Sequence, residues 1–328
     1  MATLLSRIKG TGSALPEKVL TNLDLEKMVD TSDEWITTRT GIKERHIASS
    51  DECLSTFCRK AAENALEMAG LKPEDLGLII LGTVTPDQPI PSTACLLQAQ
   101  LGAVNAAAFD LAAGCTGFLY ALSIADKFIR SGAVKHALVM GGEVLSKITD
   151  WNDRTTCVLF ADGAGAVVLS AEEGERGILS SALHADGTMS DFIAVPGGGS
   201  KIPISHEMID KNLHTVKMRG NETFKIAVRS LLSVCREAIN GASLTPQDVK
   251  WFVPHQANLR IIRSVAGKLG WPEESICLNI DKTGNTSSAS IPIALDELVR
   301  SGRVSEEDIL LFAAFGAGLT WGSALIRW

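Results

Sequence analysis

The stretch FDLAAGCTGFLYA, residues 109–121, places one cysteine where an apolar strand is expected to end and an apolar helix to begin. Cys115 stands at this junction, and the residues from Phe118 onward have a helical, apolar pattern. A helix N-terminus offers unpaired backbone N–H groups and the positive end of the helix dipole, which together favour a thiolate. The pattern therefore indicates a nucleophile, although a lone cysteine beside an apolar helix also suits a small core residue.

Buried strands and amphipathic helices alternate on both sides of this stretch. A helix is expected at residues 53–69, followed by a buried strand at 76–83 and a helix at 93–101. Another buried strand is expected at 137–141, and the stretch 156–170 is interpreted as two strands joined by a glycine-rich turn. This alternation predicts an α/β layered fold.

The second half of the chain repeats short motifs of the first half in the same order. RSGAV at 130–134 matches RSGRV at 300–304, at an offset of 170 residues. Upstream, LKPED at 71–75 matches LTPQD at 244–248, at an offset of 173 residues. Several matches in one order predict an internal duplication of the fold.

The duplication predicts where the chemistry lies. Residues 1–175 and 176–328 are expected to form two similar halves that pack as one unit. The offset of 170 lays Cys115 on Asn285, so these two residues are expected to begin equivalent helices that meet at a pseudo-two-fold axis. His255 directly follows an apolar strand. Because α/β sheets place their chemistry where strands lead into helices, we expect the three side chains to converge on one cleft.

A thiolate, an imidazole and a carboxamide in one cleft suit acyl transfer from a thioester. Cys115 would take the acyl group, and backbone N–H groups would stabilise the oxyanion. His255 and Asn285 would donate hydrogen bonds to the carbonyl of a second substrate as it becomes an enolate, and no metal is needed. A structural histidine is the alternative interpretation of His255 when its position opposite Cys115 is disregarded.

Composition argues against several other classes of function. The chain has 328 residues, 45% hydrophobic and 21% charged, which is typical of a globular protein with a large core. A net charge of −7 argues against nucleic acid or an anionic membrane as the main partner. The sequence has no signal-peptide pattern and no apolar run of about 20 residues, which predicts a cytoplasmic protein. The seven cysteines include no C-x-x-C pair, which weighs against a disulfide framework and a zinc site.

The motif TSDEWITTRTGI, residues 31–42, suggests a binding surface near the N-terminus. Ser32 or Asp33 is expected to cap a short helix that presents Trp35 and Arg39 on one face. An aromatic plane beside a guanidinium suits a nucleotide with phosphates, and a structural cation–π pair is the alternative.

Four longer motifs are specific when they occur together. They are AAGCTGFLYAL around Cys115, VPHQANLRII around His255, GNTSSASIPIAL around Asn285 and the terminal FGAGLTWGSALIRW. With these motifs the chain resembles β-ketoacyl-acyl-carrier-protein synthase III, the initiating condensing enzyme of bacterial type II fatty-acid synthesis. The resemblance implies the thiolase fold, a duplicated five-layered α/β/α/β/α sandwich that is usually a homodimer. It also implies the condensation of acetyl-CoA with malonyl-acyl-carrier protein to acetoacetyl-acyl-carrier protein, CoA and carbon dioxide, without a cofactor or metal.

The resemblance implies a role for each matching residue. Cys115 would be the acylated nucleophile, while His255 and Asn285 would promote decarboxylation and hold the enolate. The backbone amides of Cys115 and Ala317 would form the oxyanion hole. Ala317 stands where the family pattern has a glycine. An alanine still supplies the amide, so the difference concerns the conformational freedom of the backbone more than the activity. Ile90 would enter the acyl pocket across the dimer interface. The residues implied at the CoA and pantetheine site, with Trp35 and Arg154 around the adenine and Arg39 at the phosphates, are Thr31, Trp35, Arg39, Arg154, Gly220, Asn258 and Phe315.

Positive charge is concentrated in two stretches of this otherwise acidic chain. Residues 211–236 contain six Lys or Arg against one Glu, and residues 255–271 contain no Asp or Glu. On the helix expected after His255, Arg260 and Arg263 are three residues apart and are predicted to face outward together. A solvated helix face is the alternative. With the family resemblance, these stretches predict a docking surface for an acidic acyl-carrier protein, formed by Lys225, Arg260, Arg263 and Lys268.

Related enzymes and a non-catalytic protein are the alternative functions. Plant-type polyketide synthases share Cys115, His255 and Asn285. Hydroxymethylglutaryl-CoA synthases need a glutamate as acid and base, and no motif of this sequence supplies one. A thiolase would have a second cysteine at the position of Asn285. A related acyl-CoA-primed condensing enzyme of secondary metabolism is a further alternative. A non-catalytic acyl-carrier or CoA-binding scaffold should lack the nucleophile. The sequence leaves the length and branching of the acyl primer open.

Overall fold

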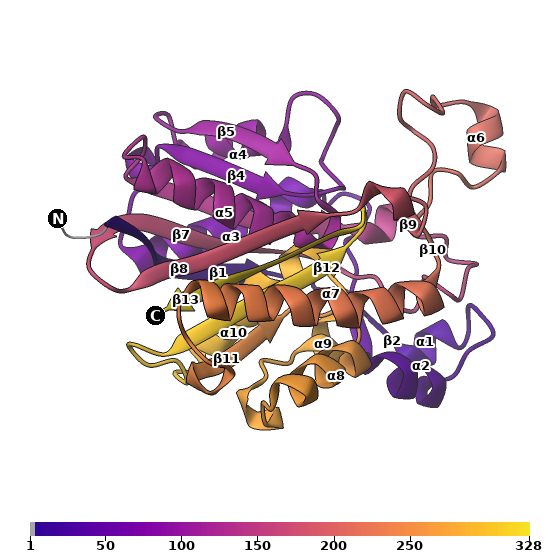
Figure 1. Ribbon diagram of the computed structural model, residues 1–328. Helices are drawn as coiled ribbons and strands as arrows, with labels where there is room; N and C mark the ends of the chain where they lie inside the picture. The colour runs from indigo at the N-terminus through magenta and orange to yellow at the C-terminus, as the bar shows by residue number, and fades with distance from the viewer. Residues whose placement is uncertain (1–3) are drawn as a thin grey trace.

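Two β-sheets form the centre of the computed structural model, which describes residues 4–328 of the chain (Figure 1). The first sheet has the strand order β1-β7-β6-β4-β5, with bounds Leu4–Ala14, Asp162–Glu173, His136–Val144, Leu78–Gly82 and Ala107–Leu111. The second has the order β11-β12-β13-β8, with bounds Val249–Pro254, Ile309–Gly316, Thr320–Arg327 and Gly177–Ala185. Strand β4 is parallel to β5 and β6, and β11 is parallel to β12, whereas β7 and β13 are antiparallel to both neighbours.

Helices cover the outer face of each sheet and fill the space between the sheets. The outer helices are α3 (Leu54–Ala69) and α4 (Thr93–Leu101) on the first sheet, and α7 (Gly220–Gly241) and α8 (Leu259–Leu269) over the second. Helices α5 (Gly117–Arg130) and α10 (Ser290–Arg300) contact strands of both sheets. Figure 1 shows α7 and α8 on the side of β12 and β13 that faces away from β4 and β5. The predicted five-layered α/β/α/β/α thiolase fold is confirmed.

The largest apolar core surrounds the two central helices. Leu122 of α5 and Leu295 of α10 are fully buried, together with Ile80 of the first sheet and Phe312 of the second. Because apolar side chains from both sheets cover these helices, the helices are fixed relative to the strands. Their N-terminal ends are therefore held in place at the site described below.

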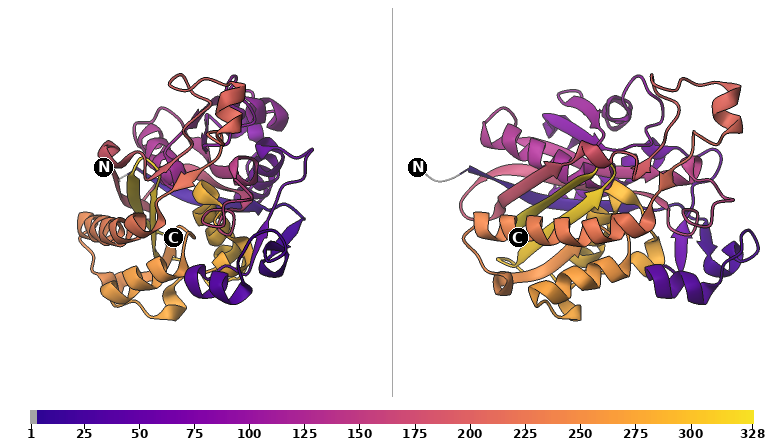
Figure 2. Two further views of the ribbon diagram at one scale, coloured as in Figure 1. Left: turned by 90° about the vertical axis from the view of Figure 1, so that its right-hand side faces the viewer. Right: turned by 45° about the vertical axis from the view of Figure 1, so that its right-hand side comes forward.

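The remaining elements are short. They are the strands β2 (Val19–Thr21), β3 (Glu44–His46), β9 (Ile193–Ala194) and β10 (Lys217–Met218), the helices α1 (Asn22–Leu25), α2 (Asp33–Thr40), α6 (His206–Asp210) and α9 (Ile280–Thr283), and the 3₁₀ helices η1 (Pro73–Asp75), η2 (Gly114–Thr116), η3 (Leu145–Ile148), η4 (Gly187–Met189), η5 (Pro246–Asp248), η6 (Glu273–Ser275) and η7 (Ser287–Ala289). Figure 2 shows that the N-terminal segment with α1 and α2, in indigo, lies beside the C-terminal helix α8, in orange. None of the helices within residues 4–328 is long and apolar enough to cross a membrane.

Several strands of the first sheet recur in the second at an offset of 173 residues. Strands β1 and β8 begin at Leu4 and Gly177, and β6 and β12 begin at His136 and Ile309. The predicted duplication is therefore present in the fold. The chain passes from the first sheet to the second in the turn between β7 and β8, where the predicted boundary after residue 175 falls. The division into two domains at that residue stays a prediction.

The helix starts at the centre of the molecule correct one detail of the predicted repeat. Gly114 begins η2 with a φ of 54°, and Ser287 begins η7 with a φ of 50°. The offset at this point is 173 rather than 170, so Cys115 aligns with Ser288. The predicted equivalence of Cys115 and Asn285 is wrong by three residues.

The offset of 170 does hold at the other ends of the same helices. The Asp126 carboxylate binds Arg130 Nε in α5, and the Asp296 carboxylate binds Arg300 Nε in α10, at 2.8 Å in each pair. Helix α5 has 14 residues and α10 has 11. The offset therefore changes by nearly one turn within the helix, and a motif match at its C-terminal end does not fix the alignment at its start.

Strand β7 is one continuous strand where the sequence predicted two strands and a turn. The glycine-rich stretch lies inside the strand, which begins at Asp162 and pairs with both β1 and β6. A Cβ atom on Gly165 would lie 2.7 Å from the backbone nitrogen of Ile293 in α10. The glycine therefore allows close contact between a strand and a central helix, a function that glycine also has outside turns.

Capping residues set the ends of the helices that carry the candidate site. The Ser32 hydroxyl accepts a hydrogen bond from the Trp35 N–H at 3.1 Å, and Gly41 ends α2 in the left-handed region with a φ of 86°. The side chain of Asn258 caps α8 by accepting the Arg260 N–H at 2.9 Å. The predicted short helix with a Ser32 cap is confirmed.

Candidate active site

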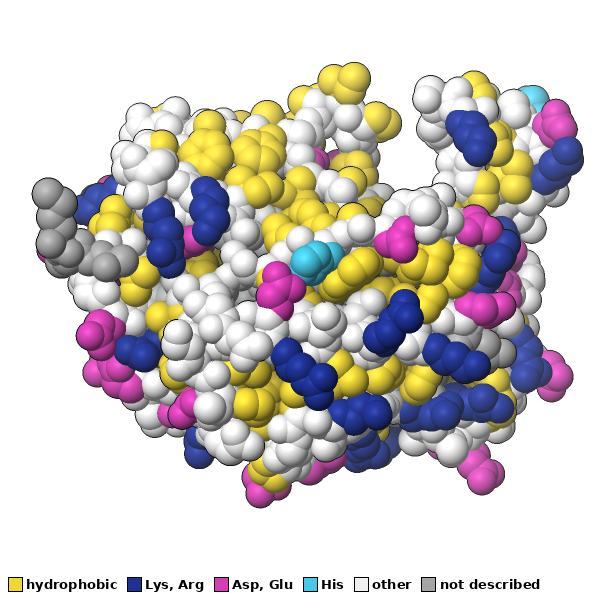
Figure 3. All heavy atoms as spheres, viewed as in Figure 1, with side chains coloured by type: hydrophobic (Ala, Val, Ile, Leu, Met, Phe, Trp, Pro, Cys, Tyr) yellow, Lys and Arg dark blue, Asp and Glu magenta, His cyan; other side chains and the backbone are white. Residues whose placement is uncertain are grey.

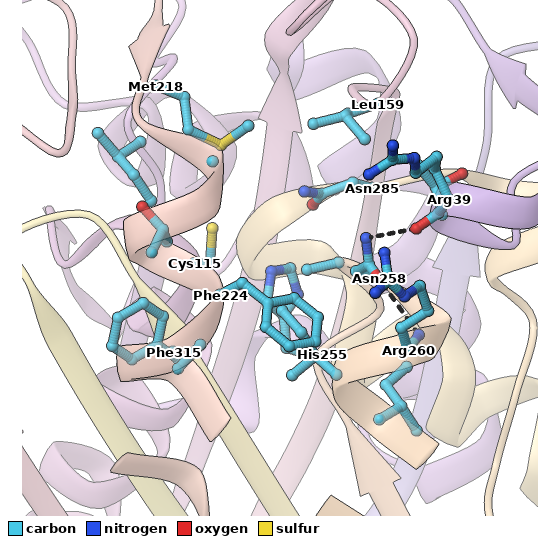
Figure 4. A pocket seen from close by; sticks show the side chains of 18 of the residues that line it. Arg39, Cys115, Leu159, Met218, Phe224, His255, Asn258, Arg260, Asn285 and Phe315 are labelled. Carbon is cyan, nitrogen blue, oxygen red and sulfur yellow. Dashed lines mark hydrogen bonds between the residues drawn. The ribbon is translucent and has the colours of Figure 1, made fainter. Parts of the chain in front are cut away.

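A cavity of about 890 Å³ opens where β11 ends and α5 begins. It is lined by residues of both halves, and Figure 4 shows Cys115, His255 and Asn285 grouped around one part of it. His255 and Asn285 are 7% and 6% exposed, whereas Arg154 and Arg260, which also line the cavity, are exposed. The cavity therefore leads from the surface to the three residues that the sequence predicted to converge.

Close backbone packing surrounds Cys115. A Cβ atom on Gly316 would lie 2.5 Å from the Cys115 nitrogen, and one on Gly114 would lie 2.9 Å from the Ala317 nitrogen, so glycine at both positions lets β12 approach η2. The N–H groups of Cys115 and Ala317 both interact with the Cys115 thiol. Two converging N–H donors are what an oxyanion hole needs. Ala317 has a negative φ whereas Gly318 has a φ of 137°, so the alanine fits its position without backbone strain.

Burial and the helix start have opposite effects on the ionisation of Cys115. Burial raises the pKa of the Cys115 thiol to about 11, while hydrogen bonds with the Ser287 hydroxyl and the backbone N–H groups act in the opposite direction. The negative charge of Glu143 raises this pKa further. Desolvation therefore acts against the thiolate that the helix start favours. The role of Cys115 as the nucleophile stays a prediction.

His255 is held as a neutral imidazole at the end of β11. Burial lowers the pKa of His255 to about 4. Its Nδ1 lies 2.6 Å from Ser290 Oγ, and Ser290 Oγ accepts the Gln256 N–H at 3.2 Å. The Ser290 hydroxyl hydrogen is therefore free to be donated to Nδ1, which leaves the proton of the imidazole on Nε2. In that tautomer Nε2 is a hydrogen-bond donor.

Asn285 is fixed by its backbone and by its side chain. Its N–H donates to the Leu159 carbonyl at 3.0 Å, and its carbonyl accepts the Ala161 N–H at 2.9 Å. The side-chain Oδ1 accepts the Ser287 N–H at 2.9 Å. Because the oxygen is already used, the Nδ2 hydrogens remain as the donors that Asn285 can offer to a ligand.

Trp35 is close to two arginines that also line the cavity. The guanidinium carbon of Arg39 is 5.8 Å from the centroid of the Trp35 ring, and that of Arg154 is 5.1 Å from it. The predicted shared face of Trp35 and Arg39 is confirmed. An adenine between Trp35 and Arg154 needs about 7 Å, twice a carbon–carbon contact distance. Arg154 would therefore leave its hydrogen bond to the Asp30 carbonyl, at 2.6 Å, to admit the base.

The other residues predicted at the CoA and pantetheine site occupy two kinds of position. Gly220, Asn258 and Phe315 line the cavity. Asn258 Nδ2 also donates to the Arg39 carbonyl at 3.0 Å, which connects α8 to α2 (Figure 4). Thr31 is outside the cavity lining, and its hydroxyl oxygen is buried without a hydrogen-bond partner within residues 4–328. A buried hydroxyl without a partner is consistent with a ligand group that binds there.

Ile90 is not brought to the cavity by the single chain. Its side chain is 86% exposed, and it does not belong to the residues that line the cavity. Its predicted place in an acyl pocket across a dimer interface requires a second chain and stays a prediction.

Basic side chains form a groove along the outer helices, which we call the α7–α8 groove. Figure 3 shows Lys and Arg side chains in a row over these helices. Arg260, near the groove, lines the main cavity with its guanidinium carbon 5.4 Å from the centroid of the Phe224 ring. The α7–α8 groove is lined by Lys225, Val228, Arg229, Leu232, Ser233, Arg236, Glu237, Asn240 and Lys268.

The four residues predicted to dock a carrier protein are not equivalent. Lys225 and Lys268 line the α7–α8 groove, whereas Arg263 binds Glu273 through two guanidinium nitrogens, at 2.7 and 3.0 Å. Arg263 therefore offers less free charge to a partner than the sequence suggested. The groove instead adds Arg229 and Arg236, which belong to the basic stretch but not to the predicted docking set.

Sequence reasoning also missed three buried polar residues around the nucleophile. Ser287 and Ser290 lie within the motif quoted for Asn285, and their hydrogen bonds to Asn285 and His255 appear only in the tertiary structure. Glu143 is fully buried in β6. A glutamate within an apolar strand pattern was the signal that could have identified it.

Comparisons with known proteins agree with the geometry. Residues 109–187 match the family model of 3-oxoacyl-[acyl-carrier-protein] synthase III, and residues 239–328 match the model of its C-terminal part. A β-ketoacyl-[acyl-carrier-protein] synthase III of Caldanaerobacter subterraneus is 56% identical over 98% of this chain and 97% of the relative. The crystal structure of the synthase III from Aquifex aeolicus has a TM-score of 0.92 at 51% identity, over 98% of this chain and all of that one. The priming β-ketosynthase of the R1128 polyketide pathway has the same TM-score at 37% identity, over 98% of this chain and 96% of that one. The chain belongs to the β-ketoacyl-[acyl-carrier-protein] synthase III family.

Proposed function

We propose that this protein condenses acetyl-CoA, or another short acyl-CoA, with malonyl-acyl-carrier protein through an acyl-Cys115 intermediate, and so initiates fatty-acid synthesis. The observation that carries the proposal is the grouping of Cys115, His255 and Asn285 around one cavity that opens to the surface. The names of the relatives support the substrates. Each step uses only side chains, backbone N–H groups and the two thioesters, so the proposal includes no cofactor and no metal.

Acyl transfer to Cys115 is the first half of the proposed reaction. The sulfur attacks the thioester carbonyl, the bond from that carbon to the CoA sulfur breaks, and CoA leaves as the thiol. The N–H groups of Cys115 and Ala317, which interact with the Cys115 thiol, are suited to bind the carbonyl oxygen as it becomes negative. The close approach of Gly316 to Cys115 supports this role, because it brings the two donors to one place.

Decarboxylation and condensation form the second half. We assign His255 Nε2 and Asn285 Nδ2 as donors to the carbonyl oxygen of the malonyl thioester, since Ser290 and Ser287 occupy the other ends of these two side chains. Loss of carbon dioxide leaves an enolate, whose carbon attacks the acyl-Cys115 carbonyl and releases the thiolate. Two neutral donors stabilise the enolate oxygen without adding a proton to carbon.

CoA is proposed to enter beside α2. Trp35 and Arg154 would enclose the adenine, Arg39 would meet the phosphates and the Thr31 hydroxyl would bind a polar group of the nucleotide. The exposed Arg154 side chain, which can move away from the Trp35 ring to admit the base, and the buried hydroxyl of Thr31 support this placement. The pantetheine arm would follow the cavity lining with Gly220, Asn258 and Phe315 towards Cys115.

The acyl-carrier protein is proposed to dock on the α7–α8 groove and at Arg260. Changing Arg229 and Arg236 together to Glu is expected to raise the KM for malonyl-acyl-carrier protein about tenfold and to reduce its salt dependence, with acylation by acetyl-CoA unchanged. Arg263→Glu is the matched control, because Arg263 is already paired with Glu273, and should change this KM less. Equal effects of both variants would reject the groove as the docking surface.

Intact-mass measurement tests the proposed function directly. After incubation with acetyl-CoA, the protein should gain one acetyl group on Cys115, and addition of malonyl-acyl-carrier protein should yield acetoacetyl-acyl-carrier protein. A protein that gains no acyl group from any acyl-CoA is a scaffold, and the proposal would fail. Acylation without condensation would place the enzyme outside the proposed reaction.

A condensing enzyme of secondary metabolism is the second candidate, supported by the likeness to the R1128 priming β-ketosynthase. A panel of acyl-CoA primers of rising length and branching separates the two, because preference for acetyl-CoA favours fatty-acid initiation.

We further propose a cytoplasmic homodimer in which Ile90 of one chain enters the acyl pocket of the other. The exposure of the Ile90 side chain in the single chain supports such a contact.

A further inference from the structure

Two buried threonine hydroxyls connect the turn that carries Cys115 to the turn that carries Ala317. Thr116 belongs to η2 and has no exposed surface, and Thr320 is the first residue of β13 and is 9% exposed. The two hydroxyl oxygens are 2.7 Å apart. The reaction as described above uses neither of them. Because buried hydroxyls bind other polar groups of the protein, their partners show what they hold in place.

The partners of the two hydroxyls are two backbone carbonyls, one from each turn. The Thr320 hydroxyl oxygen lies 2.9 Å from the carbonyl oxygen of Ala113 and 2.9 Å from that of Ala317. The Thr116 hydroxyl oxygen lies 2.5 Å from the Ala113 carbonyl oxygen, which also accepts the Thr116 N–H at 3.2 Å. When Thr116 donates to Thr320 and Thr320 donates to Ala317, both hydroxyl hydrogens are used and each acceptor has a hydrogen. A chain of hydrogen bonds then runs from η2 to the Ala317 carbonyl.

The two carbonyls lie next to the two N–H groups proposed for the oxyanion hole. The Ala317 carbonyl and one of these N–H groups are on the same residue, and Ala113 is two residues before Cys115, which has the other N–H group. A Cβ atom on Gly114 would lie 2.9 Å from the Ala317 nitrogen and 3.1 Å from its carbonyl oxygen. The two backbones are therefore in direct contact, and a shift of the Ala317 carbonyl also moves its N–H.

The Thr320 hydroxyl is the donor that holds the Ala317 carbonyl. Ala317 lies in the turn between β12 and β13, with Gly316 and Thr320 paired at the base of the turn. Leu319, at the other end of the turn, exchanges two backbone hydrogen bonds with Asp186, at 2.8 and 2.9 Å. Among the residues that the structure describes, the Ala317 carbonyl accepts a hydrogen bond from the Thr320 hydroxyl alone. Loss of this hydroxyl would therefore free Ala317 while the rest of the turn stays anchored.

We propose that Thr116 and Thr320 are positioning residues for the oxyanion hole, whose hydroxyls hold the Ala317 N–H beside the Cys115 N–H so that both donate to one carbonyl oxygen. The inference rests on the proposed function, because it concerns how these N–H groups bind the carbonyl of acyl-CoA and of acyl-Cys115. Neither threonine lines the cavity, so each acts through the backbone that it holds.

Rapid-quench acetylation of the full-length protein by acetyl-CoA tests the role of Thr320. Thr320→Val keeps the size of the side chain and removes the hydroxyl, and it should lower the maximal rate of acetylation about 10–10²-fold, because one N–H donor is misplaced. The acetyl-CoA concentration at half-maximal rate should stay within about twofold, because the N–H groups act on the developing oxyanion. Thr320→Ser keeps the hydroxyl and should stay within about threefold of the wild-type rate.

A double-mutant cycle tests whether the two hydroxyls act together. Thr116→Val should lower the maximal rate only about three- to tenfold, because the Thr320 hydroxyl still has the Ala317 carbonyl as its acceptor. The variant with both valines should be about as slow as Thr320→Val, because the two hydroxyls belong to one chain of hydrogen bonds. If the two losses multiplied instead, the hydroxyls would act separately and the proposed pair would be rejected.

The carbonyl band of the acetylated protein gives a readout that a merely structural role would not change. Acetyl-CoA with a ¹³C-labelled carbonyl identifies the acetyl-Cys115 band in an infrared difference spectrum. Hydrogen bonds to the carbonyl oxygen lower its stretching frequency, so Thr320→Val should move the band to higher wavenumber. Thr320→Ser should return it to the wild-type position.

Ser323→Ala is the matched control, because it removes another buried hydroxyl from β13. The Ser323 hydroxyl donates to the Val234 carbonyl at 2.8 Å, and Ser323 has no exposed surface. This variant should lower the Tm as Thr320→Val does, while the rate stays within about threefold and the carbonyl band does not move. An equal loss of rate in Ser323→Ala would show a general effect of packing and would overturn the inference.

Two further outcomes separate this inference from the proposed function. A folded Thr320→Val variant with the wild-type rate and carbonyl band would overturn the positioning role and leave acyl transfer intact. If Thr320→Val does not fold by circular dichroism, Thr116→Val decides through the same rate and band. A wild-type protein that no acyl-CoA acylates would instead reject the proposed function, on which the inference depends.

Discussion

The turn before α5 and the turn before α10 have the same backbone but different chemistry. Gly114 and Ser287 begin them with φ values of 54° and 50°, and the nucleophile position holds Cys115 in the first and Ser288 in the second. The Ser288 hydroxyl donates to the Gly82 carbonyl at 2.8 Å, so its side chain is used within the interior. Cys115 lines the cavity. The repeated fold thus provides two equivalent helix starts, and of these two only the one with Cys115 lines the cavity.

The strand ends beside the two turns explain this difference. At the offset of 173, Glu143 of β6 corresponds to Gly316 of β12. In the same way, Gly82 at the end of β4 corresponds to His255, which directly follows β11. Glu143 holds Ser288 by a hydrogen bond, whereas the bare backbone at Gly316 leaves room for Cys115 and the Ala317 N–H. Side chains at equivalent strand ends therefore determine which helix start lines the cavity.

Moving the cysteine from one turn to the other is the strongest test of this comparison. Cys115→Ala should lower acylation by acetyl-CoA about 10⁴-fold or more, because the nucleophile is lost. Adding Ser288→Cys to that variant should not restore it, since position 288 is buried away from the cavity. Intact-mass kinetics measure both, and Cys53→Ala, at an exposed cysteine, is the control. Recovery of acylation in the double variant would show that the two turns are interchangeable.

Removing the donors of the second half should separate the two steps of the reaction. His255→Ala and Asn285→Ala should each lower condensation with malonyl-acyl-carrier protein by about 10²–10³-fold, because one hydrogen bond to the developing oxyanion is lost. Acetylation of Cys115 should remain within about threefold in both variants. Rapid-quench measurements of acetyl-enzyme and product follow the steps separately. Equal loss of both steps in Asn285→Ala would contradict this division between the halves.

The pH dependence of alkylation sharpens the comparison at the first turn. Because the pKa of Cys115 is raised to about 11, its thiolate fraction at lower pH is small and grows with pH. The rate of modification by iodoacetamide should therefore rise about tenfold per pH unit between pH 7 and 10. Peptide mapping at limiting reagent measures it, with exposed Cys53 and buried Cys235 as internal references. A rate for Cys115 that is already constant at pH 7 would show that the helix start outweighs burial.

The smallest expected effect comes from closing the space at Gly316. Gly316→Ala would put a Cβ atom 2.5 Å from the Cys115 nitrogen, so β12 and η2 must separate. We expect a loss of stability of about 1–3 kcal/mol and slower acylation, as the two N–H donors move apart. Thermal unfolding and intact-mass kinetics measure these effects. Gly267→Ala in α8, where the added atom meets nothing within 4 Å, should be neutral or stabilising.

Local sequence determined the elements and many of the residues at the site. The apolar period and Gly70 predicted α3 within one residue of its observed bounds, because helix patterns and left-handed glycine ends depend on neighbouring residues. The same holds for α4 and for the Ser32 cap that places Trp35 beside Arg39. Motifs around Cys115, His255 and Asn285 also indicated which residues line the cavity. These features are encoded within a few residues of one another.

Tertiary structure alone decided the features that depend on contacts between distant segments. The shorter α10 shifted the repeat, so Ser288 rather than Asn285 corresponds to Cys115. Burial set the pKa of Cys115 to about 11, in the opposite direction to the helix start. Glu143 reached Ser287 from 144 residues away in the chain. Desolvation and hydrogen bonding depend on which atoms surround a group in space, and a local pattern does not contain that information.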